Sequence, residues 1–354
     1  MWRYWILPVF LFLLPSWIFA AEKDVPQCHT GRPEDAQFDY RGQCEGGNFR
    51  SFDNDIALRV FFEVPFYSFG FEDISAQKRS DATNGKTIDF DPNIGTNIGL
   101  GIAYLGYGIS GSLPLSRANN DVTRYGETRY FDFQFNYTAR RWGADIFYQS
   151  YRGFYLKDPE KFAIGYVPGM PNPQFGDLQI WNAGFGGFLN FNEKYSSNAA
   201  FSQGERQLSS AGSFVIDSSL TYTQLNSSSS LVPASELPLY PDLDRYRGGA
   251  YWLWIVRLGY GYNFIYQRMT LGGLFSLGPN LHRQTNFNTD GVSRAWRVNT
   301  SVRLRLSLWF EFKDEFIGVI GMLDVNRMEI EEFALNSRTA RVQLFYTRLF
   351  DGFF

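Results

Sequence analysis

His282 is the residue of this chain best placed to act as a general base. The chain has only two histidines, and the other, His29, lies in a polar N-terminal segment. His282 follows Gly278 and Pro279 just beyond a predicted strand. If that strand crosses a membrane, His282 lies near the surface, where the base of a lipase or lipid A deacylase would act. No serine stands beside it in a paired spacing, so a solvated loop histidine is the alternative.

A serine cluster offers a second kind of chemistry. Ser209, Ser210 and Ser213 follow Gln207 closely. A nucleophilic serine needs an adjacent base, and neither a histidine nor an acid stands next to this group. The competing interpretation is a run of small residues that lets the chain bend or pass through an interior.

Charged residues at alternate positions of predicted strands form a third group, which we expect to point into the interior of a barrel. Rings of fixed charge can line a solute path and set its selectivity. The alternative is a filled interior, because buried charges require partners. The expected interior residues are Arg59, Glu63, Asp132, Asp145, Arg257, Arg297, Arg303, Arg305, Asp324 and Arg341.

The segment 296–310 shows which elements would hold these charges. Its even positions run from Trp296 to Phe310 and are mostly apolar, whereas its odd positions carry Arg297, Arg303 and Arg305. A period of two is that of a β-strand. In a transmembrane barrel the apolar face contacts lipid, the arginines face the lumen, and aromatic residues lie at both interfaces.

Similar segments recur along the chain and predict an all-β fold, an antiparallel up-and-down transmembrane barrel. Short and long connections alternate between them, which is typical of outer-membrane barrels. Thirteen strands can be assigned, but a bacterial single-chain barrel has an even number. The alternation of short and long connections breaks between 195 and 225. We therefore expect 12 strands, with a kinked or lumen-bound piece in that region. The alternative is 14 strands, with one strand missed there. The assigned strands are 56–68, 94–105, 107–115, 131–137, 142–154, 177–191, 195–204, 212–225, 251–266, 269–279, 295–311, 316–328 and 339–350.

The two ends of the chain predict export to the bacterial outer membrane. Residues 1–20 have a charged start, an apolar run and small residues, which is the layout of a signal peptide. Residues 21–55 are polar and are expected to form a periplasmic segment ahead of a barrel over 56–354. The chain ends on Phe354, which resembles the signal read by the barrel assembly machinery.

Composition supports the same class. Aromatic residues make up 18% of the chain, yet its mean hydropathy is slightly negative. Helical membrane proteins are far more apolar, because each span needs about 20 apolar residues. The net charge of −3 gives no indication of nucleic-acid binding.

Cys28 and Cys44 are the only cysteines. In an exported chain they are expected to form a disulfide. Only His29 lies next to either one, so no metal site is predicted, and no cofactor.

Three motifs resemble a domain-of-unknown-function family, number 4421. They are Tyr148-Gln149-Ser150-Tyr151-Arg152-Gly153-Phe154-Tyr155, then Ala199-Ala200-Phe201-Ser202-Gln203 with Ser210-Ala211-Gly212-Ser213-Phe214, and Asp91-Pro92-Asn93 followed by Gly99-Leu100-Gly101. The resemblance covers most of 56–354. It implies an outer-membrane protein and supplies no catalytic residues.

Two function classes remain open from the sequence. One is a non-enzymatic barrel that acts as a narrow channel, a transporter or a surface structure. The other is a lipid-modifying enzyme that uses His282. The expected partners are outer-membrane lipid, lipopolysaccharide and the assembly machinery, and the oligomeric state stays undetermined.

Overall fold

A computed structural model describes residues 43–45, 48–52, 54–73, 87–119, 121–161, 166–232, 241–330 and 333–352. The expected signal peptide over 1–20, Cys28 and Phe354 lie outside the described residues. The disulfide and the assembly signal therefore stay predictions.

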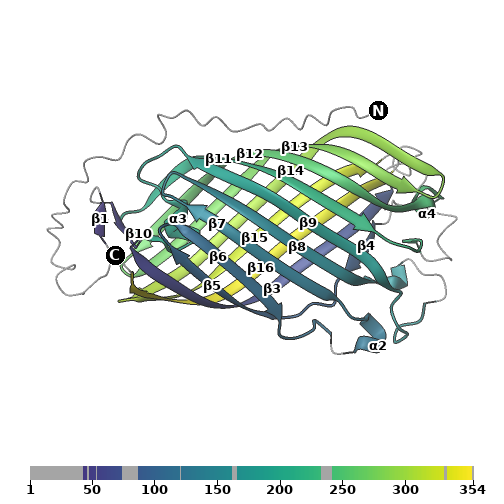
Figure 1. Cartoon of the computed structure of the whole chain (residues 1–354), viewed down its shortest axis with the longest axis horizontal. Coiled ribbons are helices and arrows are strands. Elements are labelled where there is room, and N and C mark those ends of the chain that lie inside the picture. The colour runs from purple at the N-terminus through teal and green to yellow at the C-terminus, as the bar shows by residue number, and fades with distance from the viewer. Residues whose placement is uncertain are drawn as a thin grey trace, which may run out of the picture.

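Antiparallel strands form a closed barrel with strongly tilted strands (Figure 1). The main sheet has thirteen strands. Twelve of them pair in a closed ring, and β4 (Thr87–Asp91) is an additional strand that is not a member of this ring. The twelve are β3 (Asp55–Asp73), β5 (Asn97–Tyr104), β6 (Tyr107–Pro114), β7 (Arg129–Thr138), β8 (Trp142–Leu156), β9 (Gln174–Asn190), β11 (Ala211–Asn226), β12 (Tyr246–Tyr266), β13 (Met269–Asn288), β14 (Gly291–Phe312), β15 (Glu315–Ile330) and β16 (Phe333–Asp351).

The ring closes between its first and last strands. β16 pairs with β3 over the whole length of both, with Val342 opposite Val64. The short strand β4 pairs with β3 through Phe90 and Phe69, and with β8 through Phe90 and Leu156. It therefore bridges β3 and β8 beyond the ends of the short strands β5, β6 and β7. The expected count of 12 is confirmed.

The assignment of 195–204 as a strand is wrong, and the lumen-bound piece expected in this region is found there instead. This segment forms the helix α3 (Ser197–Phe201) and is followed by β10 (Glu205–Gln207). β10 pairs with β2 (Phe49–Ser51), which pairs with β1 (Gln43–Glu45). We call residues 192–210 the plug segment, since α3 is buried and borders the cavity inside the barrel, near one of its ends (Figure 1). That end also carries the C-terminus and the tight turns at Leu105–Gly106 and Gln267–Arg268.

The opposite end carries α2 (Val122–Tyr125), α4 (Pro241–Arg245) and the short 3-10 helix η3 (Pro159–Lys161). Several strands continue further toward this end than the sequence predicts. The expected loop over 280–294 is instead a continuation of the β13–β14 hairpin, which turns at Thr289–Asp290. We call this end of the barrel the loop end and the other the plug end. None of the described helices is long and apolar enough to cross a membrane.

The outer face of the barrel is apolar and carries aromatic side chains near both ends. One chain of ring contacts crosses β7, β8, β9, β11 and β12, with centroids 4.8–6.3 Å apart, and consists of Phe131, Tyr148, Trp181, Tyr222 and Trp252. Near the plug end Tyr137 contacts Tyr107 and Trp142, each at 4.8 Å. Two aromatic bands around an apolar belt are the outer surface that a bilayer favours.

The interior is divided along the barrel axis. Toward the loop end, apolar side chains from most strands form one buried cluster that includes Phe69, Phe90, Tyr246 and Leu335. Toward the plug end, smaller apolar clusters contain Trp309 and Phe316, and Tyr195 with Leu274. Polar and charged side chains lie between these apolar ends.

Candidate functional site: the charged lumen

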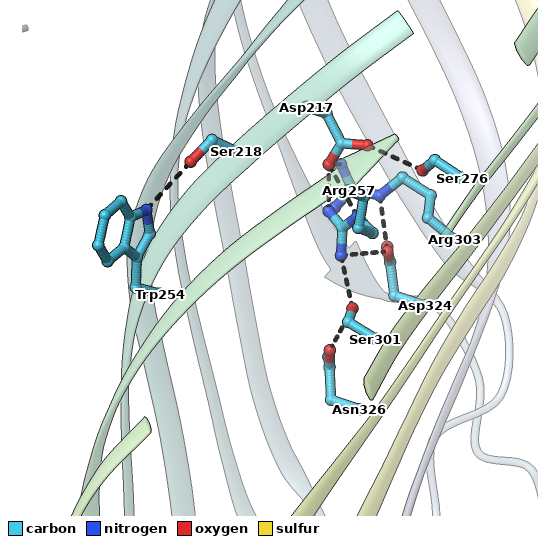
Figure 2. A network of polar contacts seen from close by, with 9 residues as sticks. All are labelled: Asp217, Ser218, Trp254, Arg257, Ser276, Ser301, Arg303, Asp324 and Asn326. Carbon is cyan, nitrogen blue, oxygen red and sulfur yellow. Dashed lines mark hydrogen bonds and ion pairs between the residues drawn. The ribbon is translucent and has the colours of Figure 1, made fainter. Parts of the chain in front are cut away.

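Two arginines and two aspartates form the larger ionic cluster in the lumen. Strand alternation turns them inward, from β11, β12, β14 and β15. Arg257 contacts Asp217 at 2.5 Å, and Arg303 contacts Asp324 at 2.6 Å and Asp217 at 3.2 Å. Figure 2 shows that all of these side chains converge. We call this group the Arg257 cluster.

Hydroxyl groups complete the Arg257 cluster. Ser276 donates to Asp217 at 2.8 Å, while Ser301 accepts from Arg257 at 2.8 Å and donates to Asn326 at 2.8 Å. Arg257 is only 1% exposed. Buried charges are tolerated when they are paired and hydrogen-bonded. Arg257 meets this condition through Nε and Nη1, while its Nη2 has only the ion contact with Asp217.

A second ionic cluster lies on β3, β7 and β16. Arg341 contacts Asp132 and, at 3.4 Å, Glu63. The acids receive further hydrogen bonds from neutral donors. Ser112 donates to Glu63 at 2.5 Å, and Gln149 donates to Asp132 at 3.1 Å. We call this group the Arg341 cluster.

The two ionic clusters flank a cavity of about 380 Å³ inside the barrel. On the loop-end side its wall is apolar and includes Tyr67, Phe69, Leu253 and Leu335. On the plug side it contacts Ser197, Phe201 and Ser202 of the plug segment. The volume is within the range of small-molecule sites, about 300–1,000 Å³.

Hydrogen bonds hold the plug segment to the barrel wall. The Trp309 indole donates to the carbonyl of Ala199 at 3.1 Å, and the Asn263 amide donates to the carbonyl of Ser196 at 2.8 Å. Arg59 donates to the carbonyl of Ser202 at 2.8 Å. Because three different strands anchor it, the plug segment is a fixed part of the lumen.

Most of the charged residues expected in the lumen are brought together there. Seven line the cavity, namely Arg59, Asp145, Arg257, Arg303, Arg305, Asp324 and Arg341. Glu63 and Asp132 are buried beside them. Arg297 differs, because it is exposed and lies away from the cavity.

The position of Arg297 follows from a separation of two strands. β14 and β15 pair only as far as Ser301 and Asn326, although β14 continues to Gly291. Beyond this point β14 has only β13 as a neighbour in the described chain. We call this separation the β14–β15 seam. Arg297 lies on the part of β14 that is paired with β13 but not with β15.

Amide side chains fill the β14–β15 seam. Asn280 of β13 donates to the carbonyls of Thr300 and Arg327, at 3.3 and 3.2 Å. Asn299 accepts from the backbone N–H of Glu329 at 3.1 Å. These contacts satisfy backbone groups that a paired neighbouring strand would otherwise satisfy.

His282 is not a loop residue, as the sequence suggested, but part of β13 and fully buried. Its Nδ1 lies 3.0 Å from Asn280 Oδ1, and its Nε2 lies 3.0 Å from Gln284 Nε2. Both ring nitrogens are therefore occupied by neutral amides. Neither contact gives His282 a nucleophile or a carboxylate to work with.

The serines of the predicted cluster accept hydrogen bonds from backbone N–H groups. Ser213 accepts from the N–H groups of Phe191 and Asn192, both at 2.9 Å, and Ser210 accepts from Ile265 N–H at 2.9 Å. These bonds fasten the ends of the plug segment. Within the described ranges, no three His, Cys, Asp or Glu side chains are arranged to hold a metal ion.

Two parts of the lumen were missing from the sequence-based expectation. Asp217 is central to the Arg257 cluster, and its alternation with the outward residues Phe214 and Leu220 would have identified it. The pair between Arg206 of β10 and Glu311 of β14 could not be found in this way. It depends on the plug segment folding inward, which strand periodicity does not report.

Comparison with protein families gives one match. Residues 49–347 match a domain of unknown function, DUF4421. The match covers most of the chain, so the chain belongs to that family. No curated protein matches it.

Solved structures of other barrels resemble the fold weakly. The outer membrane protease OmpT of Escherichia coli is 7% identical, with a TM-score of 0.38 over 85% of this chain and 98% of that one. The toluene transporter TodX of Pseudomonas putida is 8% identical, with a TM-score of 0.27 over 84% and 90%. The attachment invasion locus protein Ail of Yersinia pestis is 14% identical, with a TM-score of 0.22 over 58% and 98%. Likenesses this weak carry no argument about function.

Proposed function

We propose that this member of the DUF4421 family is a non-enzymatic outer-membrane barrel whose lumen is closed to ions and encloses a chamber for a small molecule. The observation that carries the proposal is the pairing of Arg257, Arg303 and Arg341 with lumen acids. Fixed charges select ions only when they face an open water path. Here they neutralise one another around a cavity bounded by the plug segment and an apolar cluster.

The apolar outer face and its aromatic bands support a membrane location. We place the plug end on the periplasmic side, because short turns gather there. Export by the N-terminal signal, folding by the barrel assembly machinery through Phe354, and contact with outer-membrane lipid and lipopolysaccharide belong to the same proposal.

Conductance in a planar lipid bilayer tests the closed lumen. The purified full chain should give no steady ion current. Replacing Arg303 with Ser should then lower stability without creating an anion-selective current, since Asp324 loses its 2.6 Å partner. A wild-type current that favours anions, and a loss of that preference in Arg303→Ser, would contradict the proposal.

The enzymatic alternative has its own test. His282 contacts two amides, which is not the environment of an activated base. The purified protein should release no fatty acid from phospholipid or lipopolysaccharide. Release that disappears in His282→Ala, with the barrel still folded, would establish the enzyme and overturn the proposal.

A further inference from the structure

We propose that the chamber binds an amphipathic anion, with its acidic head at Arg305 and Arg59 and its apolar chain directed toward the loop end. This names a ligand class for the chamber and therefore rests on the proposed function.

The charges next to the plug segment are not balanced. Arg59 and Arg305 both line the cavity, and neither forms a salt bridge with a carboxylate in the described ranges. Arg59 bonds Thr347 and plug atoms, all of them neutral. Asp145 is the cavity acid that has no ion pair in the described chain. The cavity lining thus holds two arginines without an ion pair and one such acid.

The remaining lumen charges do not supply the missing anion. Arg257 and Arg303 share Asp217 and Asp324 between them. Arg341 has two acids, but neutral donors such as Ser112 and Gln149 occupy these as well. The Arg257 cluster is neutral, whereas the Arg341 cluster has one acid more than it has arginines. Neutral donors and Arg341 hold that extra acid, and neither Glu63 nor Asp132 forms an ion pair with Arg59 or Arg305 in the described chain.

Arg305 also has an unused hydrogen-bond donor. Its Nε is buried and has no partner. A buried donor without a partner is uncommon, because no new hydrogen bond compensates for the bonds to water that the donor loses on burial. Arg305 lies opposite Leu274, which packs with Tyr195 of the plug segment. The free donor is therefore at the same end of the chamber as Arg59. A carboxylate or phosphate head would satisfy it with a charge-assisted bond.

The other part of the cavity wall suits an alkyl chain. Tyr67, Phe69, Leu253, Met328 and Leu335 line it toward the loop end. A ligand with one acidic head and one apolar chain would match both ends of the chamber. A small hydrophilic anion would leave the apolar wall unused, and a neutral hydrocarbon would leave Arg305 unpaired.

Equilibrium binding of dodecanoate tests the proposal, with dodecanol as the neutral probe of equal chain length. The full chain is placed in nanodiscs of zwitterionic lipid, and empty nanodiscs give the background of partitioning. We expect one saturable dodecanoate site, and at least tenfold weaker binding of dodecanol, because only the carboxylate can pair with a buried guanidinium.

Two cavity variants should move the affinity in opposite directions. Arg305→Gln should weaken dodecanoate binding about tenfold or more and leave dodecanol unchanged. Asp145→Asn should strengthen dodecanoate binding, because it removes the competing anion. Arg297→Gln on the same strand is the matched control, since Arg297 lies away from the cavity, and its binding should equal that of wild type.

Equal binding of the two probes, or no response to Arg305→Gln and Asp145→Asn, would overturn the anionic ligand. Absence of any saturable site would overturn it as well. Conductance of the same preparation separates the two proposals. A closed barrel that fails to bind dodecanoate refutes only this inference, whereas a steady ion current refutes the closed lumen itself.

Discussion

The indole Nε1–H of Trp309 donates to the carbonyl oxygen of Ala199 at 3.1 Å, which ties the plug segment to the inside of β14. Trp309 is also in edge contact with Phe316 of β15, at 5.5 Å between ring centroids. A single side chain therefore joins the barrel wall to the helix at its plug end.

Trp309→Phe should loosen the plug segment. The ring contact is kept in part, but the Ala199 carbonyl loses its buried donor, which costs about 1–3 kcal/mol. We expect a lower free energy of unfolding in urea and faster protease cleavage between 192 and 210. Trp296→Phe is the control on the same strand, because Trp296 is 64% exposed, and it should leave both measurements unchanged.

Asp217→Asn should destabilise the barrel strongly. Asp217 contacts both Arg257 and Arg303, and removing one partner from a buried ionic group costs about 3–5 kcal/mol. Asp290→Asn breaks the exposed pair with Arg245 and should cost less than about 1 kcal/mol. The two variants are compared by urea unfolding of folded protein in lipid. Equal, small effects would mean that water already screens the Arg257 cluster.

Asn299→Ala should open the β14–β15 seam locally. The N–H of Glu329 would lose its acceptor, because β14 no longer runs beside β15 at that point. Hydrogen exchange at Glu329 should become about tenfold faster or more. The N–H of Leu323, in the paired part of β15, serves as the internal reference and should not change. An unchanged exchange rate at Glu329 would show that the Asn299 contact does not hold the seam.

The sequence predicted the barrel wall well because lipid imposes a simple rule on it. Outward residues must be apolar, so Leu304 and Leu306 alternate visibly with Arg303, Arg305 and Ser307. Beyond the bilayer that rule ends. In β13 the inward residues from Asn280 to Asn286 are polar and outward Arg283 is polar too, so the strand looked like a loop.

The plug segment and the ion pairs were harder to predict for different reasons. Residues 195–204 contain enough apolar side chains for a strand, but Tyr195 and Phe201 pack in a lumen cluster instead of facing lipid. Strand alternation placed Arg303 and Asp324 inside, but it could not pair them. Pairing depends on the register between strands, which places Arg303 directly opposite Asp324.

Leu304→Arg tests which face of β14 contacts lipid. Leu304 lies between Arg303 and Arg305 and points outward, so an arginine there would enter the hydrocarbon. The expected cost is about 2–4 kcal/mol if position 304 is at mid-membrane. Val298→Arg is the matched control on the same face, six residues nearer the loop end, and should cost only about 0–1 kcal/mol if it is near the interface. A probe at 304 should also be quenched by a lipid-soluble quencher, whereas a probe at 303 should not. Quenching at 303 but not at 304 would reverse the assignment of the two faces and with it the placement of every lumen charge.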